Sequence, residues 1–142
     1  MASRLYPFGQ SAIHAGDFAL DTDVMMAFLI ATGGVNGYAY NTAHSGMTSV
    51  SAVYRASHGT ANLANKVISA SGSAFIFSSD TIAIATASAN ATNSVFHALV
   101  ICKSGANEGA HTLYAYMDLN APVTANGGGV NVSHTGISYL WV

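Results

Sequence analysis

The sequence predicts an all-β fold: an antiparallel β-sandwich or jelly-roll-like barrel with an N-terminal arm and at most one short helix. Short runs of apolar or alternating residues recur about every ten residues, as in sandwiches and barrels. Clusters of Gly, Asn and Ser separate these runs. Almost no stretch repeats its apolar residues with the helical period. The chain of 142 residues has the size of one domain, so we expect residues 1–142 to form a single β domain.

The first element is the arm, which we expect to cover residues 1–16. It contains Ser3–Gly16, with the sequence SRLYPFGQSAIHAG. Ser11 can cap one helical turn over Ala12–Ala15, and Gly16 can end that turn in the left-handed conformation. The proline and glycine that precede Ser11 disfavour helix in the first half of the arm. A turn over Asp17–Asp23 follows.

Two predicted strands, Val24–Ala31 and Val95–Lys103, contain the apolar runs VMMAFLIA and VFHALVIC, the second with a histidine inside. Such runs are typical of strands buried on both faces. Ser49–Tyr54 alternates and is either another strand or a helical turn. The remaining predicted strands are shorter or alternate, with the SASGS turn between the first two: Ala61–Ile68, Ala74–Phe77, Thr81–Thr86, His111–Asp118, Val130–His134 and Ile137–Val142.

Two of these strands carry more detailed predictions. In His111–Asp118 the period of two places alternate residues on opposite faces. One face then holds Thr112, Tyr114 and Tyr116, and the other holds Leu113, Ala115 and Met117. The last two strands form a hairpin with Thr135-Gly136 as its two-residue turn, preceded by the glycines of NGGG. That hairpin docks Trp141 against the core.

Charge is scarce in this chain, and this limits its partners. Charged residues make up 7% of the sequence, against about 25% in ordinary soluble domains. They are Arg4, Asp17, Asp21, Asp23, Arg55, Lys66, Asp80, Lys103, Glu108 and Asp118. With a net charge of −2 no basic field can hold phosphate groups, so we expect no nucleic-acid partner.

The sequence also disfavours a membrane location. The longest apolar runs have eight residues, whereas a membrane-spanning helix needs about 20. No secretory signal peptide is visible, so we interpret the glycosylation sequons at Asn90 and Asn131 as coincidences. Cys102 is the only cysteine, which excludes an internal disulfide and a cysteine-based zinc site. Its apolar surroundings predict a small, buried side chain.

The sequence also offers few candidate metal-binding or catalytic residues. The six histidines are His14, His44, His58, His97, His111 and His134. None of them lies in a metal-binding spacing such as H-x-H or H-E-x-x-H. Asp17, Asp21 and Asp23 could hold calcium, but their register lacks the glycine and glutamate of an EF-hand, and a turn-capping role is the alternative. We expect no cofactor, no metal and no enzymatic activity.

Several stretches, in order along the chain, resemble a family of small structural proteins of tailed bacteriophages. These stretches are LYPFGQSAIHAGDFALDTDVMMAFLI, YAYNTAHSGMTSV, FHALVICKSGANEGAHTLYAYMDL and APVTANGGGVNVSHTGISYLWV. The resemblance covers nearly the whole chain and depends on the order and spacing of the motifs. The sequence departs from the family pattern at Cys102, where an aromatic is common, and at Phe96-His97, where an acidic residue is common.

The resemblance implies a capsid decoration or cement protein on the outer surface of the phage head. Such a protein would bind the major capsid protein, form a homotrimer and be made in the cytoplasm of the bacterial host. The low charge independently favours faces that are covered by neighbouring molecules. Within the arm Met1–Phe8 we expect Leu5, Tyr6 and Phe8 to contact the capsid; alternatively, they cover the edge of the protein's own sheet.

Two other functions stay open at this point. A tail or neck component would use similar low-charge β surfaces. A carbohydrate- or host-binding module would stack exposed tyrosines on sugar rings, and its candidate residues are Tyr38, Tyr40, Tyr54 and Tyr114.

Overall fold

A computed structural model describes residues 3–134 and 136–140 of the chain. Within them the fold is all-β with one α-helix, α1 (Pro7–Ala15), as the sequence predicts. The strands are β1 Ser3–Leu5, β2 Met25–Ile30, β3 Arg55–Asn62, β4 Val67–Ser71, β5 Ala74–Ser78, β6 Ile82–Ile84, β7 Val95–Lys103, β8 Thr112–Thr124, β9 Val130–Val132 and β10 Ile137–Leu140. Three short 3₁₀ turns, η1 Met47–Ser49, η2 Ala52–Tyr54 and η3 Glu108–Ala110, lie in the connections.

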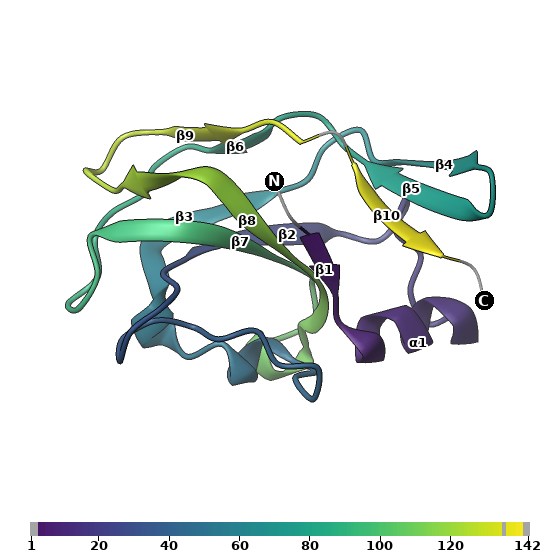
Figure 1. Cartoon of the computed structure of the whole chain (residues 1–142), viewed down its shortest axis with the longest axis horizontal. Coiled ribbons are helices and arrows are strands. Elements are labelled where there is room, and N and C mark those ends of the chain that lie inside the picture. The colour runs from purple at the N-terminus through teal and green to yellow at the C-terminus, as the bar shows by residue number, and fades with distance from the viewer. Residues whose placement is uncertain (1–2, 135, 141–142) are drawn as a thin grey trace.

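The strands form two packed layers (Figure 1). One layer is a five-stranded antiparallel sheet with the order β1-β8-β7-β2-β3. The other consists of the three-stranded sheet β10-β5-β4 and the two-stranded sheet β6-β9. The main core contains apolar side chains from both layers, among them Leu29 of β2, Leu99 of β7 and Phe77 of β5. This arrangement is a β-sandwich.

The five-stranded sheet is covered on its other face too, by the long connection between β2 and β3. A second core there contains Phe28 and Ile30 of β2, Val100 of β7, and Met47 and Val50 of the connection. Strands β2 and β7 are therefore buried on both faces along most of their length. This explains why their sequences are continuous apolar runs rather than alternating ones, and it confirms the strands predicted at Val24–Ala31 and Val95–Lys103.

The helix begins earlier than predicted, at Pro7 instead of after Ser11. Pro7 occupies the first helical position, where its missing N–H costs no hydrogen bond. Gly9 lies inside the helix because α1 packs directly on β8: a Cβ at this position would come 2.2 Å from the Leu113 carbonyl oxygen. Gly16 ends the helix with φ 82°, as predicted.

One prediction about the middle of the chain is wrong, and one open alternative is decided. Ser49–Tyr54 is not a strand: η1 and η2 occupy most of it, in agreement with the helical-turn alternative. The predicted strand Ala61–Ile68 is interrupted, since β3 ends at Asn62 and β4 begins only at Val67. Between them Asn65 takes the left-handed conformation, with φ 48°, and the chain bends there.

A β-bulge changes the predicted faces of β8. Ile101 pairs with Ala115 and the next residue, Cys102, pairs with Leu113, so Tyr114 is the extra residue of the bulge. As a result Tyr114 packs in the main core together with Ala115, whereas Leu113 packs in the second core with Tyr116. The predicted grouping of Tyr114 with Tyr116, and of Leu113 with Ala115, is therefore wrong.

The predicted C-terminal hairpin does not form. Instead β9 pairs with β6, and β10 pairs with β5. The register of β9 with β6 continues into the register of β10 with β5. The two last strands therefore run in one direction, antiparallel to β5 and β6. Gly136 is needed for close approach rather than for a hairpin turn, because a Cβ there would lie 2.6 Å from Ile76 Cγ2. Thr135 and Trp141 lie outside the described residues.

Candidate interaction surfaces

The three residues predicted to contact a capsid lie in different environments. Leu5 is half-buried at the end of β1, which pairs with β8 along the edge of the five-stranded sheet. Tyr6 is completely buried, with a relative exposure of 0%. Phe8 is 55% exposed on the first turn of α1. Residues 3–6 therefore cover the protein's own sheet, and of the three only Phe8 presents a large surface to a partner.

Tyr6 belongs to a hydrogen-bonded chain of side chains under the five-stranded sheet. Its hydroxyl lies 2.8 Å from the Tyr38 hydroxyl, which in turn lies 2.8 Å from Nδ1 of His44. Burial, and then the hydrogen bond with Tyr38, raise the pKa of Tyr6 far above its ordinary value. Burial likewise raises the pKa of Tyr38. These phenols therefore stay neutral and fasten the connection after β2 to the N-terminal segment.

This packing removes two of the four tyrosines that a sugar-binding module would use. Tyr38 is 3% exposed and Tyr114 is 0% exposed. Tyr40 is half-buried, and its hydroxyl donates a 2.6 Å hydrogen bond to the Leu5 carbonyl. Tyr54 is half-buried as well. Stacking on a sugar requires an open ring face, and neither Tyr38 nor Tyr114 has one.

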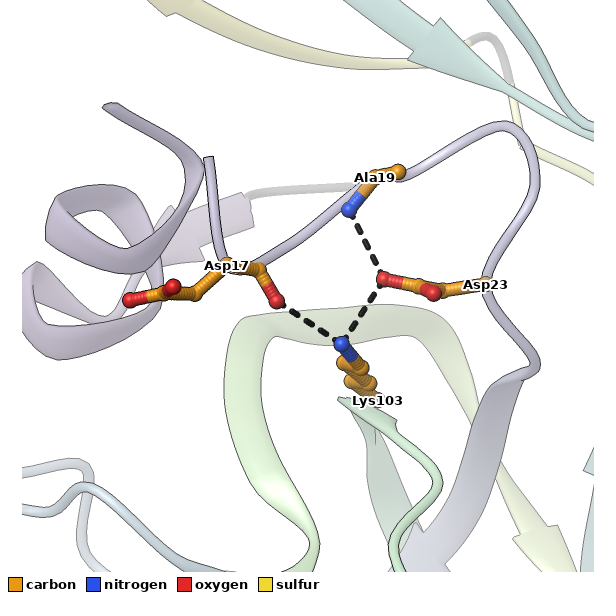
Figure 2. Close-up of polar contacts among 4 residues, drawn as sticks. All are labelled: Asp17, Ala19, Asp23 and Lys103. Atoms are coloured by element: carbon orange, nitrogen blue, oxygen red, sulfur yellow. Dashed lines mark hydrogen bonds and ion pairs between the residues drawn. The ribbon is translucent and has the colours of Figure 1, made fainter. Parts of the chain in front are cut away.

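A lysine connects the two ends of the acidic turn Asp17–Asp23, which follows α1 (Figure 2). Lys103 Nζ lies 3.0 Å from Asp23 Oδ2 and donates a 2.8 Å hydrogen bond to the Asp17 carbonyl oxygen. The same Asp23 oxygen accepts a 2.7 Å hydrogen bond from the Ala19 N–H. The Lys103 ammonium thus occupies the position that a cation would need. This geometry matches the turn-capping alternative for Asp23.

The histidines are scattered along the chain, and His44 is not the only one that makes a structural hydrogen bond. Besides His44, His97 accepts from the Thr32 N–H and His111 from the Gly105 N–H, while His134 bonds the Ser79 hydroxyl. Within residues 3–134 and 136–140, no three His, Cys, Asp or Glu side chains gather in a group that could hold a metal. Burial lowers the pKa of His134, which favours its neutral form.

Cys102 is buried on β7, as its apolar surroundings predict. Burial raises the pKa of its thiol to about 12. Because the thiolate is the reactive form of cysteine, this side chain is inert in the folded protein.

A shallow groove of about 300 Å³ lies beside β3. Its polar lining is the Arg55–Glu108 ion pair, 2.7 Å long, together with Ser57, Thr60 and Asn90. The Arg55 guanidinium also lies over the Phe28 ring, 5.8 Å from its centroid. Arg55 is thereby held by its own protein. The two charged side chains of the groove, Arg55 and Glu108, bind each other. They are therefore not free to bind a charged ligand.

The edges of the sheets differ in how well they are protected against pairing with another strand. An open edge presents free backbone groups, and proteins block it with short strands, charges, bulges or covering segments. β1 has three residues and carries Arg4, which lies over the Tyr40 ring. β3 contains a register shift, and Ser57 on this strand bridges to Ser88. Both edges of the large sheet are therefore blocked.

The strand β4 has none of these protections. It has five residues, Val67–Ser71, and every one of them is exposed. It contains no charge and no proline, and its pairing with β5 has no bulge. Only Val67 and Ile68 of β4 lie in a predicted strand, because SASGS is predicted as a turn. The missed signal is Gly72-Ser73, a two-residue turn with glycine first, between two stretches of strand-forming residues.

Comparisons with protein-family models, with curated proteins and with solved structures find no match to this chain. In the part of the chain that the structure describes, no helix combines the length and apolar character needed to cross a membrane.

Proposed function

We propose that this chain is a virion structural protein of a tailed phage, a decoration protein that binds the outer surface of the head. In this role it stabilises the lattice of the major capsid protein, as the sequence resemblance implies. It assembles as a homotrimer and uses Phe8, on the exposed face of α1, as part of its capsid contact.

The observation that supports this proposal is the scarcity of free charge in the folded chain. Only ten residues of the chain are charged, and four of them neutralise one another in the pairs Arg55–Glu108 and Lys103–Asp23. Charge on a protein surface repels identical molecules and keeps them apart in solution. A nearly neutral surface therefore suits a protein whose copies stand close together on a particle.

The exposed apolar residues are consistent with contacts that are individually weak. Phe8, Val24, Val53 and Val67 are each about half exposed, and they come from different parts of the chain. A single contact of this kind binds weakly, but several contacts made at once by an oligomer bind durably. Decoration of a repeating lattice provides that multiplicity.

Electron microscopy of the virion, with the density of this chain located, tests the proposal. We expect it on the outer surface of the head at local three-fold positions. Density in the tail or neck, or its absence from the particle, would overturn the assignment to the head. A second test is the binding of the purified chain to heads that lack it. Heads should bind the chain, and isolated glycans should not.

The capsid contact itself can be tested with a matched pair of variants. Phe8→Ser removes the exposed ring on α1, and Val35→Ser removes an apolar side chain that is 96% exposed in a loop. We expect Phe8→Ser to weaken binding to heads by roughly tenfold, because a buried aromatic anchor carries more binding energy than an average contact. Val35→Ser should bind like the unmodified chain. Equal binding by both variants would remove Phe8 from the contact.

A further inference from the structure

We infer that β4 is a self-association edge. Two copies of this chain pair their β4 strands antiparallel, and the two-fold axis passes between their two Ser69 residues. The inference adds a two-fold contact between trimers to the assembly in the proposed function, and so rests on that assembly. The observations that carry it are the pairing of β4 with β5, the exposure of β4, and the lack of charge on this strand.

The hairpin geometry determines which backbone groups of β4 are open. Ser71 and Ala74 flank the two-residue turn and pair directly, so they exchange both of their backbone hydrogen bonds. Hydrogen-bonded pairs alternate along an antiparallel ladder. Ser69 and Val67 therefore also bond to β5. The N–H and C=O groups of Ile68 and Ala70 point the other way, toward the free edge.

No other segment covers these groups in the described part of the chain. β4 is the outer strand of the sheet β10-β5-β4, and in Figure 1 its hairpin with β5 projects at the end of the upper layer. Ile68 is 37% exposed although its partner on β5, Phe77, is fully buried. The hairpin thus carries apolar surface that its own core does not cover.

A second copy of β4 fits this edge better than a charged strand would. With Ser69 opposite Ser69, Ile68 of each copy lies opposite Ala70 of the other, and Val67 lies opposite Ser71. Each Ile68–Ala70 pair exchanges two backbone hydrogen bonds, so the two pairs satisfy all the open groups of both strands. The strand has no charge that could repel its own copy. An isologous contact of this kind uses the same patch on both partners.

The contact extends the proposed assembly without replacing its three-fold symmetry. A two-fold contact joins two chains at a time, so on a shell it would connect one trimer with its neighbour. The paired strands are short, and the contact is correspondingly weak in dilute solution. It becomes effective where a lattice holds the copies close together.

The test uses opposite charges at the two-fold axis. Ser69 is exposed, and in the proposed pair the two Ser69 residues form a non-hydrogen-bonded pair, in which side chains come closest. Ser69→Lys and Ser69→Glu should each weaken self-association roughly fivefold, because like charges then face each other directly. An equal mixture of the two variants should associate at least as well as the unmodified chain. Ser73→Lys, in the adjacent turn, adds the same charge away from the axis and should change association little.

Association is measured by sedimentation over about a hundredfold range of concentration, since a self-association equilibrium depends on concentration. Amide hydrogen exchange of the unmodified chain provides the second measurement, and Ile68 and Ala70 should become protected as association proceeds. The inference would be overturned if the mixture associated no better than either variant alone. It would also be overturned if exchange at Ile68 and Ala70 did not change with concentration. Either result would leave a head location found by microscopy intact.

Discussion

The hydroxyl oxygens of Tyr6 and Tyr38 lie 2.8 Å apart, and both side chains are buried. Tyr6 follows the edge strand β1, whereas Tyr38 belongs to the connection that covers the second core. The contact therefore joins the N-terminal segment to that connection, and the bond from Tyr38 to His44 Nδ1 continues it. A segment predicted to contact a capsid is thus an integral part of the fold.

Replacing Tyr6 with Phe tests this contact. The ring stays in place while the Tyr38 hydroxyl loses its hydrogen-bond partner Tyr6. We expect the free energy of unfolding in urea to fall by about 1 kcal/mol, the net value of one hydrogen bond. Tyr54→Phe is the control, because the Tyr54 ring also contacts Tyr38 but its hydroxyl makes no hydrogen bond in the described part of the chain. Equal losses in both variants would contradict the role of the Tyr6 hydroxyl.

Gly9 provides a second test, in which the expected change in the free energy of unfolding has an unusual sign. Replacing glycine with alanine inside a helix normally stabilises a protein by about 1 kcal/mol. Here the new methyl group would meet the Leu113 carbonyl oxygen at 2.2 Å. We expect Gly9→Ala to lower the free energy of unfolding by about 1–3 kcal/mol, as overpacking does. Ser11→Ala, at an exposed position of the same helix, should cost little. A stabilised Gly9→Ala variant would show that α1 does not pack this closely on β8.

The sequence was most informative where a single element determines the pattern. β7 has the predicted bounds because a continuous apolar run is long enough to mark a strand buried on both faces. The predicted left-handed end of α1 at Gly16 is also confirmed, since few residues other than glycine take that conformation. In both cases the cause lies in the segment itself.

The features that sequence reasoning missed depend on a partner strand. The bulge at Tyr114 exists only in the pairing of β8 with β7, and it moves one aromatic side chain to the opposite face. Gly136 looks like a turn residue, but it is needed because β10 passes close to Ile76. The open edge of β4 likewise follows from its place in the sheet. Alternation within one segment contains none of this information.

The reactivity of Cys102 provides a third test. Burial raises the pKa of this thiol to about 12, so almost no thiolate exists at neutral pH. We expect the folded chain to react with a thiol reagent at least roughly a hundredfold more slowly than the chain unfolded in urea. The rate is measured by mass spectrometry after a pulse of the reagent. Labelling at equal rates in both states would show that β7 opens readily.

The turn closed by Lys103 predicts a dependence of stability on pH. The Ala19 N–H, and then the Lys103 ammonium, hold the pKa of Asp23 below its ordinary value. The folded chain therefore binds fewer protons at Asp23 than the unfolded chain does. The resulting stabilisation is fully present above pH about 4 and is lost as the pH falls through the lowered pKa.

Its size should be below about 1 kcal/mol, because both side chains are partly exposed and solvent screens the pair. We expect Asp23→Asn to lower stability at pH 7 by up to this amount and to flatten its decrease at acid pH. Asp21→Asn removes a carboxylate from the same turn that makes no hydrogen bond within the described residues, and it is the matched control. Urea unfolding between pH about 2 and 7 measures both effects. If the two variants gave the same profile, Asp23 would not be the carboxylate on which the turn depends.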